Sequence, residues 1–341
     1  MQKERLRYIE SIKLVKNDLI RLDSIQISNS HNEIRLFCIM RNEALRLPHF
    51  LAYYERLGVD RFFFVDNGSN DGSVEIVLGK NDCHVFSIDN SYKNHWTWME
   101  YLLESYGKGH WCVVADVDEL FSWPDYEQVT LPDLIAYLEI MGETAVRSLL
   151  LDLYPKEPVR YALYNPGDDP FKTLCWFDMK FDKTNFRFFD RKGNVYFEME
   201  TYIGGVRDRV FRQKMPNHLS KISLFKMAKR TYLTQEMHAI NHARVSSLHG
   251  VTFHTKFLHD LPAEAREESK REVHFGNAIV YKIVDSVLRC TPDISFWNEN
   301  SCELIDSEQL VQIGLMKRPA GFREFIDTHL RGVKQNLDIV S

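Results

Sequence analysis

Three carboxylates stand together in Asp116-Val117-Asp118-Glu119, directly after the apolar run 111–115. If that run is a strand, residues two apart project to the same side, about 6.5 Å apart along the chain. Asp116 and Asp118 could then share one hard divalent cation and leave positions open for a diphosphate. A solvated acidic turn is the alternative interpretation, because two aspartates at this spacing are common. The buried run before them favours a site for Mn²⁺ or Mg²⁺.

A second polar turn, Asp66-Asn-Gly-Ser-Asn-Asp-Gly72, follows the apolar run 61–65. An acid at a strand end, with small residues behind it, can accept hydrogen bonds from a base or a ribose. An Asx-type turn that caps the next helix is the alternative. A third polar segment follows the run 34–40 and either lines the same site or caps a helix. The candidate nucleotide contacts of these two segments are Asp66, Asn67, Arg41, Asn42 and Glu43.

The elements that must position these side chains alternate between strands and helices. Four short apolar runs indicate buried strands, and the segments between them carry apolar residues at helical spacing. The expected strands are 34–40, 61–65, 85–88 and 111–115, and the expected helices are 47–57, 74–78 and 96–106. This alternation predicts an α/β fold with a mostly parallel sheet flanked by helices. Ligands of such sheets bind beyond the carboxyl ends of the strands, where the polar turns fall.

The pattern divides the chain into three parts. Residues 1–30 are expected to form a charged helix and a connector, and residues 31–260 the α/β domain. Within that domain, 154–170 carries four prolines and is expected to be a long irregular loop. Residues 261–341 are expected to form a helical C-terminal extension.

Composition narrows the class of protein. Hydrophobic residues at 44% and charged residues at 27% are ordinary for a globular chain. The net charge of −5 argues against nucleic acid as the main partner. No apolar run approaches the roughly 18 residues of a membrane-spanning helix, and the charged N-terminus does not resemble a secretory signal. The six cysteines are scattered without metal-ligand spacing. These features predict a cytoplasmic protein with at most peripheral contact at the inner face of a membrane.

Two segments resemble the glycosyltransferase family 2-like group, whose catalytic domain has the Rossmann-like GT-A fold. They are CIMRNEALRLPHFLAYYERLGVDRFFFVDNGSNDGS (38–73) and WCVVADVDELF (111–121). Weaker similarity continues through 204–211, 219–224 and 249–258. The resemblance implies inverting, metal-dependent transfer of a sugar from a nucleotide-diphosphate donor, with a UDP-sugar the first expectation. It also implies a glycan or glycolipid acceptor in surface polysaccharide biosynthesis.

The resemblance also implies roles for individual residues. Asp66 would contact the base, although the family usually has two adjacent acids where this chain has Asp66-Asn67. Asp116 and Asp118 would contact the metal and the ribose-diphosphate. His254 is the expected third metal ligand, with His249 and His238 as rivals, and Lys256 is expected to pair with the phosphates.

An inverting enzyme needs a general base, and no Glu-Asp pair marks it here. Asp208 lies at about the spacing that the family suggests, and Glu200 is the alternative; for both, local salt bridges compete with a catalytic role. The basic residues of the same region would bind an anionic acceptor or form a solvated face. They are Arg207, Arg209, Arg212 and Lys214.

Two other functions remain open at this stage. A nucleotidyltransferase on a related α/β fold would release pyrophosphate, but the chain lacks a glycine-rich phosphate loop near its N-terminus. A non-catalytic protein that binds nucleotide sugars would keep the fold without turnover.

Overall fold

Strands and helices alternate through the first third of the chain, as the apolar pattern predicts. The computed structural model describes residues 12, 15–28, 30–189, 195–212, 217–234 and 237–329, with 186–189, 195–199 and Phe275 described by their backbone alone. The alternating elements are β2 (Ile34–Met40), α2 (Leu47–Leu57), β3 (Arg61–Asp66), α3 (Ser73–Leu78), β4 (Cys83–Ser87), α4 (His95–Leu102) and β5 (Trp111–Val114). The chain continues from α4 through a π-helical stretch, Leu103–Gly107.

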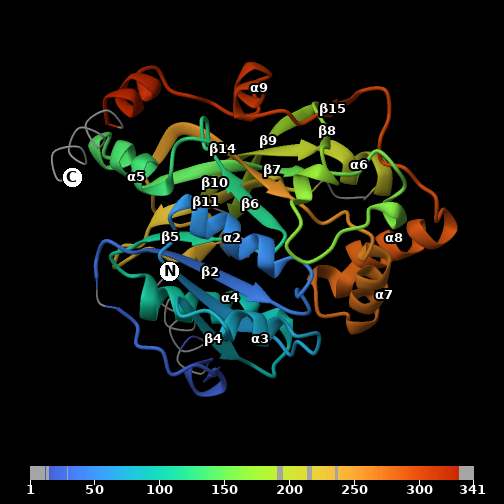
Figure 1. Cartoon of the computed structure of the whole chain (residues 1–341), viewed down its shortest axis with the longest axis horizontal. Helices are drawn as coiled ribbons and strands as arrows, with labels where there is room; N and C mark the ends of the chain where they lie inside the picture. The colour runs from blue at the N-terminus through green and yellow to red at the C-terminus, as the bar shows by residue number, and fades with distance from the viewer. Residues whose placement is uncertain are drawn as a thin grey trace.

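Nine strands of the described residues form one central sheet, in the order β1-β4-β3-β2-β5-β11-β7-β14-β6. Those not yet given are β1 (Ile20–Arg21), β6 (Glu119–Ser122), β7 (Ala145–Asp152), β11 (Ser220–Lys226) and β14 (Val245–His254). β4, β3, β2 and β5 pair in parallel, as do β7 and β14. β1, β11 and β6 pair antiparallel with their neighbours. The predicted α/β fold with a mostly parallel sheet is therefore confirmed (Figure 1).

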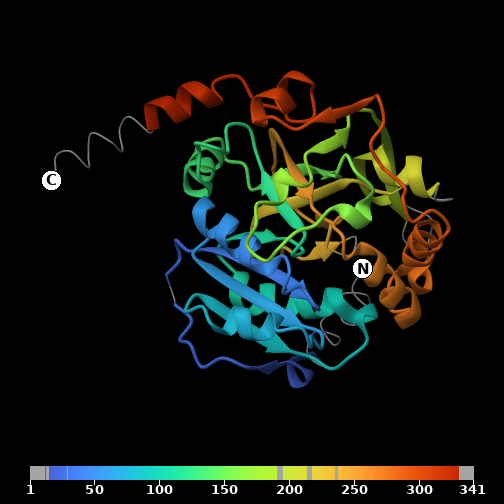
Figure 2. The same ribbon diagram turned by 45° about the vertical axis from the view of Figure 1, so that its right-hand side comes forward.

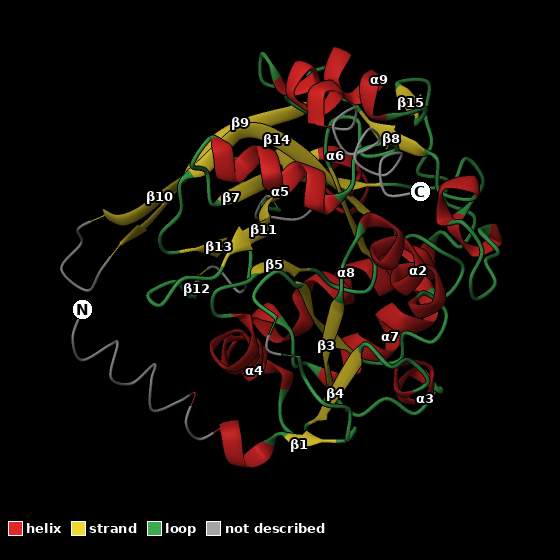
Figure 3. Cartoon of the chain, turned by 60° about the vertical axis from the view of Figure 1, so that its left-hand side comes forward, coloured by secondary structure: helices red, strands yellow, loops and turns green. Residues whose placement is uncertain are grey.

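Alternating side chains on β2 explain why helices cover both faces of this sheet. All seven β2 residues are buried. Leu36 and Cys38 pack with α2 in one hydrophobic cluster, whereas Phe37 and Ile39 pack with α4 in another. Trp98 of α4 is fully buried in the second cluster and is a core residue. Figure 3 accordingly shows α4 on one side of β3 and β4, with α2 and α3 on the other.

The middle of the chain adds one helix against the sheet and a long hairpin. Its remaining elements are α5 (Leu131–Ile140), β8 (Trp176–Asp178), β9 (Phe181–Phe189), β10 (Val195–Gly204), α6 (Gly205–Phe211), β12 (Leu233–Thr234) and β13 (Ala239–Ile240). β9 and β10 pair antiparallel. Between β7 and β8 the chain is irregular, as expected, with short 3-10 turns at Val159–Tyr161 and Pro170–Lys172.

The C-terminal part consists of α7 (Leu261–Arg271), α8 (Phe275–Cys290), β15 (Ser301–Glu303), α9 (Ser307–Gln312) and a helical segment over 322–329. β15 pairs with β8, and Phe322 stacks edge-on against Tyr137 of α5 with ring centroids 4.9 Å apart. Figures 1 and 2 both show this last helical segment, in red, beside α5. The division at residues 30 and 260 stays a prediction. Across the described residues, no helix combines the length and apolar character needed to cross a membrane.

Candidate active site

Three neighbouring strands bring the Asp116–Glu119 turn together with two residues far away in sequence. His254, the last residue of β14, pairs with Asp152 at the end of β7 and with Glu119 at the start of β6. The backbone N–H and the hydroxyl of Thr255 donate to the Asp118 carbonyl oxygen at 2.7 and 3.1 Å. The turn is therefore fixed at the carboxyl ends of β7 and β14, where ligands of α/β sheets bind.

A chain of charged groups runs through His254. Its Nε2 lies 3.0 Å from Oδ2 of Asp118, and its Nδ1 lies 2.7 Å from Oδ1 of Asp152. Arg207 of α6 donates two hydrogen bonds from Nε and one from Nη2 to the Asp152 carboxylate, at 2.7–3.0 Å. Asp152 was not among the residues expected from the sequence. The sequence feature that could have indicated it is its position directly after the apolar run Leu149–Leu151. Asp152 and His254 are both less than one-tenth exposed.

The two ends of the His254–Asp118 pair shift each other's pKa. Burial opposes the charge on His254, but the Asp118 carboxylate outweighs it and raises the pKa of the imidazole to about 9. Burial likewise opposes the charge on Asp118, but the positive imidazole holds the pKa of that carboxyl well below its usual range. Both groups are therefore charged at neutral pH in the metal-free protein.

Raising the pH is expected to destabilise the metal-free protein through His254. Its folded pKa of about 9 exceeds the ordinary value of about 6.5, so this stabilisation is complete below about pH 6.5 and is lost as the pH rises through 9. The loss should reach about 2–3 kcal/mol. Urea unfolding at pH 6, 7.5 and 9.5 in EDTA measures it, and His254→Gln should flatten the wild-type slope. Equal slopes in both proteins would contradict the assignment.

A second ion pair, between Glu119 and Lys221 of β11, lies beneath the turn. Lys221 donates to Oε2 of Glu119, and the same oxygen accepts the Asp116 backbone N–H at 3.0 Å. The side chains are 1% and 3% exposed for Lys221 and Glu119. Burial opposes the charge on Lys221, but the Glu119 carboxylate reverses the effect and raises its pKa. The pair anchors the backbone that carries Asp116.

A cavity of about 410 Å³ opens beside this turn, and Asp116, Lys221, Tyr92, His238, His274 and Tyr281 contribute to its wall. Within the described residues, the Asp116 carboxylate has no hydrogen bond or ion pair, so it is available to a ligand. Burial lowers the pKa of His238 to about 3, so this histidine is neutral. It lines the cavity, but it is not part of the chain through Asp118.

The segment after β2 is bound to the turn after β3. Asn42, at φ 56°, donates its backbone N–H to the Ser69 hydroxyl at 3.0 Å and accepts from the Asn70 backbone N–H at 2.9 Å. The Glu43 N–H donates to the Ser73 hydroxyl at 2.8 Å. These bonds bring the two predicted nucleotide segments side by side.

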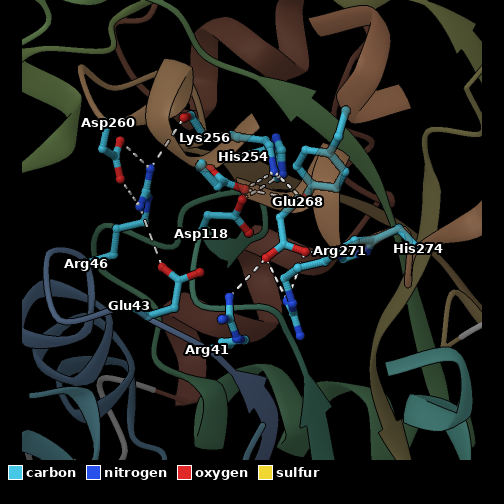
Figure 4. Close-up of polar contacts among 12 residues, drawn as sticks. Arg41, Glu43, Arg46, Asp118, His254, Lys256, Asp260, Glu268, Arg271 and His274 are labelled. Carbon is cyan, nitrogen blue, oxygen red and sulfur yellow. Dashed lines mark hydrogen bonds and ion pairs between the residues drawn. The ribbon is translucent and has the colours of Figure 1, made fainter. Parts of the chain in front are cut away.

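Three basic side chains near the site form ion pairs with carboxylates of α7 or of the residue just before it. Arg41 lies 2.6 Å from Glu267 of α7, and Lys256 lies 2.8 Å from Glu264. Arg46 donates two hydrogen bonds to Asp260, at 2.7 and 2.9 Å, and lies 3.6 Å from Glu43. Figure 4 shows Arg41, Arg46 and Lys256 around Asp118 and His254. Burial raises the pKa of Glu43 well above its usual range.

Asp66 and Asn67 largely stabilise their own turn. The Asp66 carboxylate accepts the backbone N–H groups of Gly68 and Ser69 at 3.2–3.3 Å. The Asn67 amide donates to backbone carbonyls at Ile88 and Asn90, at 3.1 and 2.9 Å. Asp71, rather than Asp66, accepts the first N–H of α3, from Ser73 at 3.0 Å. A direct contact between Asp66 and a base stays a prediction.

The two candidate general bases lie on different elements. Asp208 is on α6 and accepts a hydrogen bond from the Asn217 amide at 3.0 Å. Glu200 is exposed on β10 and lies 3.2 Å from Lys183 of β9. Neither carboxylate contacts Asp118 or His254 within the described residues, and both roles stay predictions.

His249, the other candidate metal ligand on β14, lies away from the Asp118 turn. His249 precedes His254 by five positions on β14, so the two residues lie roughly 16 Å apart at the rise of a β-strand.

Among the basic residues, the solvated-face alternative is wrong for Arg207, because its guanidinium donates hydrogen bonds to Asp152 beside His254. Arg209 instead pairs with Asp178, at the end of β8, at 3.0 Å. Arg212 ends α6 in a left-handed conformation, and Lys214 lies outside the described residues.

The donor set fits the chemistry of the expected metal. Two carboxylates suit Mg²⁺ and Mn²⁺, and Nε2 of His254 already faces Asp118. A metal-bound histidine usually donates its other ring N–H to a carboxylate, as Nδ1 of His254 can to Asp152. In the described part of the chain, no three such side chains already converge as a ready metal cluster. In a metal site, Nε2 of His254 would be the ligand atom, and Asp152 would hold the proton on Nδ1.

No model of a known protein family matches the chain. Over 107 residues it is 30% identical to a glycosyltransferase family 92 protein of Oryza sativa subsp. japonica, a match that covers 28% of this chain. Part of this chain is similar to a glycosyltransferase. The similarity supports a glycosyltransferase relation in general rather than family 2. The match spans 17% of the plant glycosyltransferase's length.

Solved structures show only distant likeness. A 4-diphosphocytidyl-2C-methyl-D-erythritol synthase from Anaerococcus prevotii DSM 20548 matches with a TM-score of 0.27 and 9% identity, over 58% of this chain and 73% of that one. A second structure of a 4-diphosphocytidyl-2C-methyl-D-erythritol synthase gives 0.26 and 13%, over 61% and 83%. These scores are too low to define the fold or the function.

Proposed function

We propose that this chain is a metal-dependent glycosyltransferase that transfers a sugar from a nucleotide-diphosphate donor to a glycan or glycolipid acceptor. The observation that carries the proposal is the Asp118–His254–Asp152 chain at the strand ends, next to a cavity that Asp116 lines, whose carboxylate has no partner among the described residues. A GT-A fold, inversion at the sugar carbon and a UDP-sugar donor belong to the same proposal. The cavity volume falls within the range of small-molecule sites.

Asp116, Asp118 and His254 would hold Mn²⁺ or Mg²⁺ in this enzyme. When bound, the metal supplies a Lewis acid that balances the charge on the leaving diphosphate. Asp152 keeps the proton of His254 on Nδ1, which leaves Nε2 as the atom facing the donor site. Arg207 in turn fixes Asp152, so the imidazole keeps one orientation.

The other polar residues would bind and orient the donor. Lys256 and Arg41 lie on the two sides of the turn and would contact phosphate oxygens, as charge-assisted hydrogen bonds are strong. The segments around Asn42 and Asn67 are joined by hydrogen bonds and would receive the nucleoside. In this arrangement the nucleoside would lie on the joined segments after β2 and β3, and the sugar would lie toward the cavity that Asp116 lines.

Asp208 is our candidate for the general base that accepts the proton of the acceptor hydroxyl. It follows Arg207 on α6, and the Arg207 side chain reaches His254. Glu200 is a weaker candidate because it is solvent-exposed and pairs with Lys183 on the hairpin. Removing the base should lower transfer and leave donor binding unchanged.

The products of the reaction distinguish this function from its alternatives. The protein is incubated with a panel of nucleotide sugars, Mn²⁺ and glycan or glycolipid acceptors. We expect release of a nucleoside diphosphate and glycosylation of the acceptor. In a parallel incubation with a nucleoside triphosphate and a sugar phosphate, release of pyrophosphate would identify a nucleotidyltransferase instead. Tight donor binding without product across the acceptor panel would identify a binding protein.

A further inference from the structure

Carboxylates of helix α7 form ion pairs with basic side chains around the candidate site. Glu264 lies 2.8 Å from Lys256, and Glu267 lies 2.6 Å from Arg41. Just before the helix, Asp260 pairs with Arg46 at 2.7 Å. The cations come from the segments after β2 and β14, so α7 lies at the ligand edge of the sheet, beyond the end of β2 (Figure 1).

Glu268 is the centre of this contact. Its carboxylate accepts hydrogen bonds from Arg271 at 2.6 and 2.9 Å and from Arg41 at 3.2 Å, and it lies 2.8 Å from Nε2 of His274. Burial opposes its charge, but His274 and Arg271 lower the pKa of Glu268 to about 2. Arg271 also reaches Asn67 at 3.4 Å, in the predicted nucleotide turn. Two guanidinium groups and an imidazole that converge on one carboxylate resemble the surroundings of a bound phosphate.

These cations remain accessible from solvent. The side chains of Arg41, Lys256 and Arg271 are 21%, 19% and 23% exposed. Each cation is partly open to solvent, so an incoming anion can reach it and take the place of the carboxylate. A diphosphate carries more charge than a carboxylate and can accept from several donors at once. It is therefore a strong competitor for these cations.

Resting on the proposed function, we propose that Glu264 and Glu268 occupy the diphosphate site of the nucleotide donor, and that the donor displaces them from Lys256, Arg41 and Arg271. Helix α7 is then an internal competitor that releases its cations when a diphosphate arrives. Arg271 joins the donor-binding residues, although the sequence did not single it out.

The helix can lose these charges and keep its place. Leu261 and Ala265 of α7 are fully buried, in a cluster that also contains Val284 and Leu288 of α8. This apolar face holds α7 on α8; Glu268 is buried at its edge, and Glu264 is partly exposed beside it. Glu264→Gln and Glu268→Gln remove the charge with a side chain of nearly the same size, so the apolar contacts of Leu261 and Ala265 should stay in place.

Calorimetric titration with inorganic pyrophosphate tests the proposal, in EDTA and again in Mg²⁺. The double variant Glu264→Gln/Glu268→Gln should bind pyrophosphate at least about tenfold more tightly than wild type, since one ion pair no longer has to be broken at each carboxylate. Adding Arg271→Met should remove most of the gain. Glu272→Gln is the matched control, because Glu272 follows the same helix but pairs with Lys282. It should bind as wild type does.

Binding by the double variant that equals or falls below wild type, or no binding by either protein, would overturn the proposal. An equal gain in Glu272→Gln would also overturn it, because net charge would then explain the effect. If the double variant fails to fold, Glu264→Gln alone decides, with an expected gain of about threefold or more. Pyrophosphate binding needs neither acceptor nor turnover. A gain without sugar transfer would therefore reject only the proposed function, and transfer without a gain would reject only the role of α7.

Discussion

Replacing Asp118 by Asn is expected to lower sugar transfer by about 100- to 1,000-fold, because a charge that stabilises the departing diphosphate is lost. The amide is nearly the same size as the carboxylate, so the turn should keep its shape through the two hydrogen bonds from Thr255 to the Asp118 carbonyl. The His254 imidazole loses its ionic partner, and its pKa should fall. Initial rates of nucleoside diphosphate release with saturating donor and Mn²⁺ measure the effect.

The matched control is Glu75→Gln, which removes one negative charge from an exposed position on α3. It should leave the rate unchanged. Circular dichroism and thermal unfolding verify that Asp118→Asn is folded, with a stability loss of about 1–3 kcal/mol for the altered buried contact. Wild-type rates in folded Asp118→Asn would remove Asp118 from the mechanism.

Replacing Lys221 by Met should destabilise the protein by about 3–5 kcal/mol, because it leaves the Glu119 carboxylate buried without a counter-charge. Glu119 is 3% exposed, and its Oε2 also holds the Asp116 backbone N–H. Loss of Lys221 should therefore disturb the turn that carries both aspartates. The midpoint of urea unfolding measures the change in the free energy of unfolding.

Two further variants separate the buried pair from a general effect of charge. Lys226→Met changes the same residue type on β11, but Lys226 is 43% exposed and pairs with Glu139 at the surface. Such pairs contribute about 0–1 kcal/mol. Lys221→Met combined with Glu119→Gln should recover most of the stability, since the unpaired charge is gone. Similar losses in Lys221→Met and Lys226→Met would mean that burial of the pair is not the cause.

Much of the fold was predictable because β2, β3 and β5 are buried on both faces. Such strands appear as continuous apolar runs, and short runs of this kind are readable without knowledge of their partners. Asp116 and Asp118 could be placed at the ligand edge for the same reason, since they directly follow one of these runs.

The remaining part of the site depends on pairing that a local pattern does not contain. β11 inserts antiparallel between β5 and β7, although many residues separate it from both in sequence. This insertion brings Lys221 under Glu119, and the pairing of β7 with β14 brings Asp152 beside His254. Arg207 appeared to be one of several surface arginines, because α6 is too short to show which face is buried. Long-range partners, rather than residue types, decide these roles.

Calorimetric titration of UDP into the wild-type protein, with Mn²⁺ and then with excess EDTA, tests whether Asp116 and Asp118 bind the donor through a cation. We predict binding in Mn²⁺ that weakens by at least about tenfold in EDTA, and a similar loss in Mn²⁺ for Asp116→Asn/Asp118→Asn. UDP that binds the wild-type protein equally well in EDTA, or that binds the folded double variant as tightly as wild type, would contradict a metal-dependent donor site at this turn.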